Sequence, residues 1–131
     1  MGTEETKKVV FKMLEAMNRL DFKGQLDLLA EDATWWILGN IPPLTGTRNK
    51  REMAELFNNI GQIFPKGLKL IVDHLIAEGD YAAVETRTYG ETAKGKIYQN
   101  KFHWKFEVRG GKIQTVKEYT DALYAKEILL G

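Results

Sequence analysis

Residues 98–109, YQNKFHWKFEVR, alternate between mostly apolar and polar side chains, and a single amide, Asn100, interrupts the apolar set. A period of two is typical of a β-strand with one face toward the core and one toward solvent. Gly110 and Gly111 follow, and glycine readily adopts the positive φ angles of a tight turn. Residues 112–120 then place apolar side chains among polar neighbours. The pattern predicts a long antiparallel hairpin.

Three earlier segments show helical spacing, in which apolar side chains recur every three or four residues. Asn49 with Glu52 three residues later forms the capping-box pattern that begins a helix, and Thr3 suits the same capping role. Asp121 likewise predicts the start of a short terminal helix. The three earlier helices are predicted over residues 3–20, 23–30 and 49–64.

The remaining segments predict strands joined by short turns. Residues 33–38, ATWWIL, are rich in aromatic and β-branched side chains, whereas residues 39–46, with two prolines, predict a loop. Residues 67–92 predict two further strands with a turn at Gly79 and Asp80. Because strands joined by short turns pair with their neighbours, we expect a mostly antiparallel sheet with helices on one face, which is the α+β class.

Composition narrows the classes of function. The chain has 131 residues, 44% of them hydrophobic, which predicts one domain over residues 1–131. Its 19 Lys and Arg and 18 Asp and Glu are mixed along the chain, so neither nucleic acid nor a membrane is an expected partner. The absence of cysteine suits a cytoplasmic location. With two histidines at unsuitable spacing and no glycine-rich phosphate loop, we expect no metal and no cofactor.

The chain resembles the SnoaL-like, ketosteroid-isomerase-related branch of the nuclear transport factor 2-like superfamily. The resemblance lies in the order of the elements and in three phrases, LLAEDATWW, LIAEGDYAAVE and FHWKFEVRGGKIQTVKEYTD, and it covers roughly residues 9–129. It implies a cone-shaped α+β fold, in which a curved sheet wraps around helices and leaves a deep pocket, usually in a homodimer. Such proteins include isomerases, cyclases, dehydratases, epoxide hydrolases and proteins without catalysis, so the fold alone does not choose a function.

The catalytic residues of these relatives are mostly replaced here. By the resemblance, the tyrosine and two aspartates of steroid isomerases correspond to Met13, Ile37 and Phe102, which transfer no proton. The arginine, two aspartates, tyrosine and asparagine of limonene-type epoxide hydrolases correspond to Thr86, Thr88, Glu118, Trp35 and Ile37. Only Glu118 keeps a comparable group.

The same comparison predicts which way the strands face. With Ile37, Phe102 and Glu118 pointing into the cone, the period of two turns alternate residues of the paired strands inward as well. The residues expected to bind substrate are Trp35, Ile37, Asn100, Phe102, Trp104, Thr86, Thr88, Met17 and Phe57. The opposite face is expected to form a homodimer, and it carries Trp36, Glu85, Arg87, Tyr89, His103 and Tyr119.

Glu118 and His74 are the candidate catalytic residues. Desolvation in an apolar cone raises the pKa of a carboxyl group, which suits Glu118 to acid–base chemistry near neutral pH. His74 shares its strand face with apolar residues at 70, 72 and 76, and this predicts that it points inward, toward Glu118. The alternatives are a glutamate paired with Lys117 or Lys105 or solvated at the pocket mouth, and a histidine bonded to the backbone of the wall.

Three functional hypotheses follow. The first is a cofactor-free acid–base enzyme of the isomerase, cyclase, dehydratase or hydratase type that acts on an apolar small molecule. In it, Asn100 would polarise a substrate oxygen. The second is a small-ligand-binding protein with the same pocket and no catalysis. The third is a homodimeric interaction module that uses the outer face of the sheet.

Overall fold

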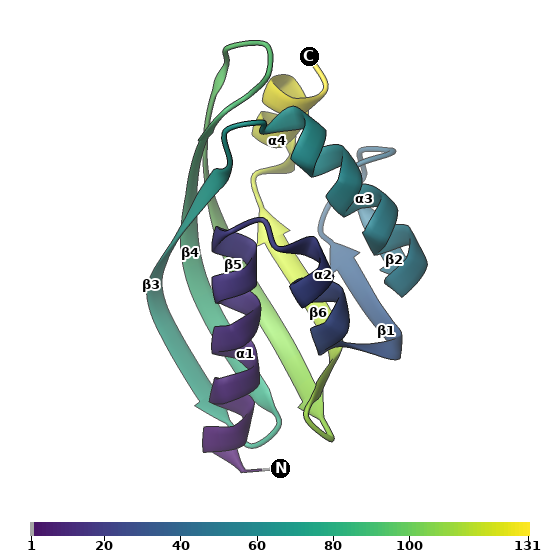
Figure 1. The fold of residues 1–131 in the computed structure, drawn as a ribbon, viewed down its shortest axis with the longest axis vertical. Helices are drawn as coiled ribbons and strands as arrows, with labels where there is room; N and C mark the ends of the chain where they lie inside the picture. The colour runs from purple at the N-terminus through teal and green to yellow at the C-terminus, as the bar shows by residue number, and fades with distance from the viewer. Residues whose placement is uncertain (1) are drawn as a thin grey trace.

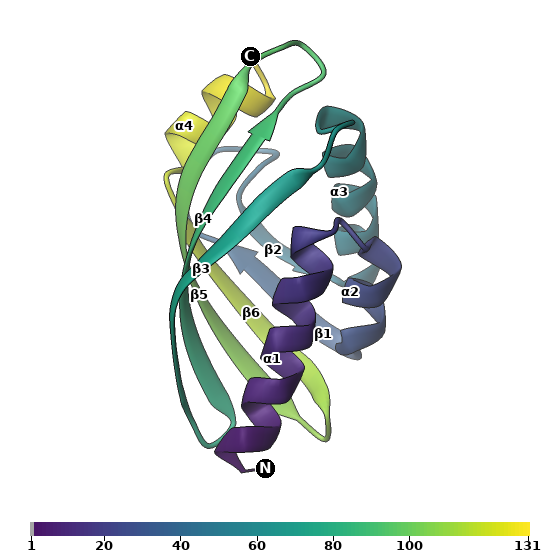
Figure 2. The same cartoon turned by 60° about the vertical axis from the view of Figure 1, so that its left-hand side comes forward.

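The computed structural model describes residues 2–131, and its helices lie on the concave side of a strongly curved sheet (Figures 1 and 2). The chain begins with two helices, and a third helix lies between the second and third strands. A fourth helix follows the last strand. The elements are α1 (Thr3–Asn18), α2 (Phe22–Leu28), β1 (Leu29–Ile37), β2 (Gly46–Asn49), α3 (Lys50–Ile63), β3 (Leu68–Glu78), β4 (Tyr81–Glu91), β5 (Ile97–Arg109), β6 (Lys112–Thr120) and α4 (Ala122–Leu129).

The six strands form one sheet in the order β2-β1-β6-β5-β4-β3. All neighbouring pairs are antiparallel except β1 and β6, which run parallel. The expected α+β class and mostly antiparallel cone are confirmed. Strand β2 was not predicted, because its four residues, GTRN, are too short and too polar to show a period of two. It forms the edge of the sheet by pairing with β1.

The predicted hairpin is present as β5 and β6. Gly110 and Gly111 have φ angles of 56° and 81°, which glycine adopts without steric cost. Beyond a bulge near the turn, the register places Trp104 of β5 opposite Glu118 of β6. The apolar face of β5 turns inward, and this fixes which residues of the neighbouring strands face the helices.

The helix caps were predicted from the sequence with one error. Asn49 and Glu52 form the expected capping box, and the side chain of Asp121 caps α4. Thr3 does not cap α1, because Gly2 occupies that position. The hydroxyl oxygen of Thr3 instead accepts a hydrogen bond of 3.0 Å from the backbone N–H of Gly79, and so ties the helix to the turn between β3 and β4.

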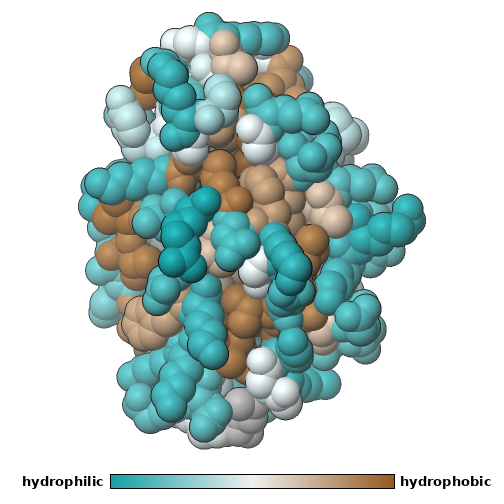
Figure 3. All heavy atoms as spheres, viewed as in Figure 1, coloured by the Kyte–Doolittle hydropathy of each residue, from teal (hydrophilic) through white to brown (hydrophobic). Residues whose placement is uncertain are grey.

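The hydrophobic core fills the end of the cone where α1 meets the β5–β6 turn. Its fully buried members include Val10 and Met13 of α1, Phe106 and Val108 of β5, and Ile113 of β6. Met13, which stands where steroid isomerases have a tyrosine, belongs to this core. On the helix side, apolar surface shows between polar side chains in the middle of the face (Figure 3). Within residues 2–131, none of the helices has the length and apolar character to cross a membrane.

The expectation that His74 faces inward is wrong. The pairing of β3 with β4 shifts between Val72 and His74, and this bulge reverses the alternation along the rest of β3. His74 therefore pairs with Glu85 and is exposed, and Ile76 is also turned outward, with 60% of its surface exposed. Leu75 packs against the core in its place. A single extra residue in the strand thus separates His74 from the interior.

Candidate functional site

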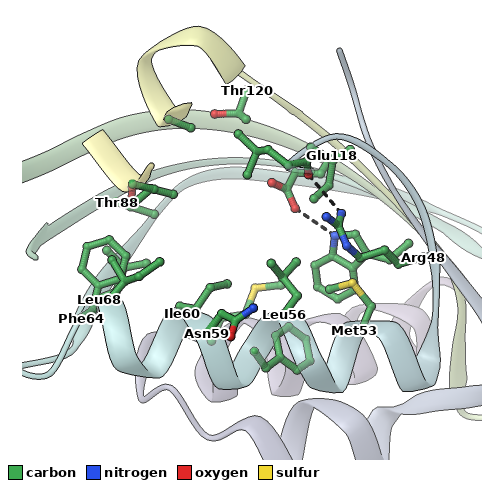
Figure 4. Close-up of a pocket in the computed structure, with 18 of the residues that line it drawn as sticks. Arg48, Met53, Leu56, Asn59, Ile60, Phe64, Leu68, Thr88, Glu118 and Thr120 are labelled. Carbon is green, nitrogen blue, oxygen red and sulfur yellow. Dashed lines mark hydrogen bonds between the residues drawn. The ribbon is translucent and has the colours of Figure 1, made fainter. Parts of the chain in front are cut away.

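A cavity of about 400 Å³ lies between α3 and the concave face of the sheet, and residues of α4 line one end of it. Figure 4 shows Glu118 and Thr120 on the sheet side, opposite the α3 residues Leu56, Asn59 and Ile60. Most of the lining is apolar and aromatic, with few polar groups, as in many small-molecule sites. The polar side chains that line it are Gln25, Arg48, Glu52, Glu55, Asn59, Thr88, Tyr98, Glu118 and Thr120.

Glu118 lies near the end of β6, with Ile37 of β1 on one side and Trp104 of β5 on the other. The indole Nε1 of Trp35 donates a hydrogen bond of 2.9 Å to Oε1 of Glu118. Within residues 2–131, no side chain or backbone N–H donates to the second oxygen, Oε2. Because no buried side-chain oxygen in these residues lacks a partner, Oε2 must be open to the cavity. Trp35 therefore holds one oxygen of the carboxyl group, and the other oxygen faces the cavity.

Burial raises the pKa of Glu118 to about 7. The hydrogen bond from Trp35, and then the positive charge of Arg48, favour the ionised form and oppose this rise. The side chain keeps some accessible surface, but that surface faces the cavity that it lines, so desolvation by the surrounding protein dominates. A carboxyl group with a pKa near 7 supplies both a base and an acid at neutral pH.

Arg48 stands opposite Trp35 in the pairing of β1 with β2, and Figure 4 shows it beside Glu118. Its guanidinium donates one hydrogen bond of 3.1 Å to the carbonyl oxygen of Leu44 and another to that of Pro43. These bonds orient Arg48 along the cavity wall, close enough to lower the pKa of Glu118. Arg48 was missed by the sequence analysis, because the strand that carries it was not predicted.

Residues 10–116 match the SnoaL-like domain family. The chain belongs to the SnoaL-like family. This SnoaL-like protein is also similar to an NTF2-like protein from Burkholderia xenovorans LB400, with 26% identity, a TM-score of 0.77 and 98% of both chains covered. It is similar in fold to a putative isomerase from Bacillus subtilis, with 18% identity, a TM-score of 0.84, and 98% of this chain and 94% of that chain covered.

A third similar structure is that of TerC co-crystallized with polyporic acid, with 18% identity, a TM-score of 0.82, and 97% of this chain and 99% of that chain covered. Among curated proteins, none matched the SnoaL-like protein. The family match ends at residue 116, just before Glu118, so membership by itself assigns no role to that carboxyl group.

Most of the residues expected to bind substrate line the cavity of the SnoaL-like protein. Trp35 makes edge-to-face contacts with Phe57 and Trp104, with ring centroids 5.7 and 5.9 Å apart. These contacts build an aromatic wall around Glu118. The expected residues that line the cavity are Trp35, Ile37, Phe102, Trp104, Thr88, Met17 and Phe57.

Three expected site residues of the SnoaL-like protein do not line the cavity. His74 is on the outer face, for the reason given above. The hydroxyl oxygen of Thr86 accepts a hydrogen bond of 2.8 Å from Nε1 of Trp104, so it satisfies a buried indole. Asn100 is buried and donates to the hydroxyl of Tyr98 and to the carbonyl of Asp121. Period-two alternation predicts which face of the sheet a side chain lies on. It does not predict whether that side chain already forms hydrogen bonds with its neighbours in the protein.

Tyr98 was missed as a site residue although it belongs to the inward alternation of β5. It lines the cavity near α4, where Ala122, Ala125 and Leu129 also contribute to the wall. Residues 2–131 contain no cluster of His, Cys, Asp or Glu able to hold a metal ion. The polar groups that the cavity offers to a bound molecule are those of Glu118, Arg48 and the other carboxyl, hydroxyl and amide side chains of its lining.

Proposed function

We propose that this SnoaL-like protein is a small-molecule enzyme that uses Glu118 to move a proton within the cavity, without a cofactor. The observation that carries the proposal is a carboxyl group with a pKa of about 7 whose free oxygen opens into a cavity of about 400 Å³. As a base, Glu118 would remove an acidic proton from carbon or oxygen. As an acid, it would return that proton elsewhere on the molecule. Isomerisation, cyclisation and dehydration all use such a transfer.

The aromatic wall supports a planar, apolar class of substrate. Trp35 and Trp104 present ring faces and edges beside the carboxyl group, which favours a planar ring compound whose reacting carbon lies next to a carbonyl. Arg48 adds a positive charge that would stabilise the enolate formed by proton removal. The similar structures of a putative isomerase and of TerC with polyporic acid support a small-molecule enzyme in this fold.

Deuterium exchange tests proton removal directly. We would incubate 2-tetralone, an apolar two-ring ketone with acidic C–H groups, in deuterated buffer and follow loss of its C–H signals by NMR. We expect the protein to accelerate exchange, with a rate that rises through pH 7 as Glu118 ionises. Glu118→Gln should remove the acceleration.

The matched control is Glu107→Gln. Glu107 is also a buried carboxyl group, but it pairs with Arg109 at 2.6 Å and does not line the cavity. Its substitution should leave the exchange rate unchanged. Equal rates for wild type and Glu118→Gln would contradict the proposed role.

Ligand binding without catalysis is the second candidate. The observation that favours it is the outward position of His74, which leaves Glu118 without the acid–base partner expected from the sequence. In that case 2-tetralone would exchange at the buffer rate with wild-type protein, and Glu118→Gln would change only its affinity.

We also propose that the outer face of the sheet pairs two copies of the chain. This face exposes Tyr81 and Tyr89, each 47% accessible, and Tyr119 at 36%. Such aromatic residues are typical of interfaces. Arg87→Ala with Tyr89→Ala should convert a dimer into a monomer by light scattering, whereas Arg51→Ala on α3 should not. An unchanged dimer would contradict this assignment.

A further inference from the structure

Tyr98 places a phenol group in the cavity wall next to α4. Its ring contacts the rings of Phe64 and Tyr124, with centroid distances of 5.7 and 5.6 Å, and only 3% of the residue is exposed. These contacts restrict the movement of the ring. Because Tyr98 also lines the cavity, its hydroxyl position is fixed relative to anything bound there.

Asn100 determines which hydrogen bond the hydroxyl makes. The side-chain oxygen Oδ1 of Asn100 accepts from the backbone N–H of Lys101 at 2.9 Å, and its Nδ2 donates to the carbonyl of Asp121 at 3.2 Å. A backbone N–H only donates and a carbonyl only accepts, so the amide of Asn100 has one allowed orientation. In this orientation Nδ2 also donates to Oη of Tyr98 at 2.9 Å.

The hydroxyl of Tyr98 is thereby an acceptor toward Asn100, and its own proton must go elsewhere. Within residues 2–131, no oxygen or nitrogen accepts that proton. Burial raises the pKa of Tyr98 well above its ordinary value, so the proton stays on the hydroxyl throughout the neutral range. A buried donor without an acceptor is costly, and a molecule in the cavity is able to supply the acceptor.

The hydroxyl and Glu118 lie at different positions along the cavity. Asn100, which the hydroxyl contacts, precedes Trp104 by four residues, and Trp104 lies opposite Glu118. Four residues span roughly 13 Å of strand backbone, and, after burial, the charge of Glu118 still contributes to the raised pKa of Tyr98. Between the two ends, Phe102 and Trp104 stack with centroids 5.1 Å apart and planes 12° apart, and both line the cavity. This geometry suits an elongated planar molecule.

We propose that Tyr98 is a specificity-determining residue that donates a hydrogen bond to an oxygen at the distal end of a fused-ring ligand, with Asn100 as its positioning residue. The ligand class is a molecule of two or three fused rings, with one oxygen at Tyr98 and a separate reactive carbon at Glu118. The proposal rests on the ligand cavity of the proposed function but does not require catalysis.

Equilibrium dialysis with a matched pair of probes tests the proposal. The probes are 2-acetylnaphthalene and 2-isopropylnaphthalene, which share a ring system and differ mainly in the ketone oxygen. Wild-type protein should bind the ketone roughly fivefold more tightly, as expected for one hydrogen bond. Tyr98→Phe should abolish this preference, because it removes the hydroxyl and keeps the ring.

The controls separate Tyr98 from other donors. Tyr124→Phe removes the hydroxyl of the stacked neighbour, which does not line the cavity, and should keep the preference. Equal binding of the two probes by wild-type protein, or a preference that survives Tyr98→Phe, overturns the role of Tyr98 and leaves the ligand cavity intact. Binding of neither probe by wild type overturns both proposals.

Discussion

The two faces of the sheet each hold a carboxyl group with a shifted pKa, and the two pKa shifts have opposite directions. On the concave face, burial raises the pKa of Glu118 to about 7, and a neutral indole holds one of its oxygens. On the convex face, Asp73 is exposed and accepts hydrogen bonds of 2.8 to 3.1 Å from Arg87, which lower its pKa. The same functional group thus has a raised pKa inside the cone and a lowered pKa outside it.

The difference shows that the surroundings of a carboxyl group decide its chemistry. Asp73 has water and a guanidinium that both stabilise its charge. Glu118 has lost most of its water. Arg48 acts on it through its charge and not through a hydrogen bond, because the guanidinium donates to the carbonyl oxygens of Leu44 and Pro43. The concave face should therefore respond strongly to substitution and to pH, and the convex face weakly.

Truncation of an aromatic side chain should produce the largest difference between the faces, measured as the loss in the free energy of unfolding. Phe106 on the concave face is fully buried, so Phe106→Ala should lower the free energy of unfolding by about 3–5 kcal/mol. Tyr89 on the convex face is 47% exposed in a single copy of the chain, so Tyr89→Ala should cost less than about 1 kcal/mol at protein concentrations where the chain is monomeric. Urea denaturation in dilute solution measures both. A loss for Tyr89→Ala similar to that for Phe106→Ala would contradict the exposed position of Tyr89.

The pH dependence of stability should isolate Glu118. Its pKa is about 7 in the folded protein against an ordinary value of 4.5, so the folded state holds the proton more tightly. The resulting stabilisation is complete below pH 4.5 and is lost as the pH rises to 7. Relative to Glu118→Gln, wild type should lose roughly 3 kcal/mol of unfolding free energy across this range. A constant difference from pH 4.5 to 7.5 would contradict the raised pKa.

Removing the indole donor should raise the pKa of Glu118 further. Trp35→Phe keeps an aromatic ring but removes the N–H that favours the ionised carboxylate, so the titration midpoint should move up by roughly one pH unit. The carboxyl carbon signal of Glu118, followed by NMR, measures this midpoint. Trp36→Phe is the matched control, because Trp36 packs against Tyr119 on the convex face and should leave the midpoint in place.

The smallest effect should come from the convex ion pair. Asp73→Asn removes the partner of Arg87, but in a single copy of the chain both side chains are exposed and water replaces the lost interaction. In dilute, monomeric protein the change in stability should be close to the resolution of a denaturation experiment and should shrink further in concentrated salt. A large, salt-independent loss in the monomer would contradict the exposed position of the pair.

The sequence predicted helices, strands and turns well where the signal lies within a few neighbouring residues. The hairpin of β5 and β6 followed from period-two alternation and two glycines, and the start of α3 followed from Asn49 and Glu52. The family resemblance predicted the inward position of Glu118, which the alternation of β6 then supported. His74 was misplaced because a bulge in β3 leaves no mark in the sequence.

The sequence alone determined the order of the longer elements and the α+β class, because helix spacing, strand alternation and turn residues act over a few neighbouring positions. The family resemblance made Glu118 a candidate. Tertiary structure decided which groups reach the cavity. It brought Trp35 of β1 against Glu118 of β6 and turned Arg48 toward them. It also placed the indole N–H of Trp104 where it donates to the hydroxyl of Thr86. These contacts join residues far apart in the chain, and they depend on curvature and register that only the folded sheet defines.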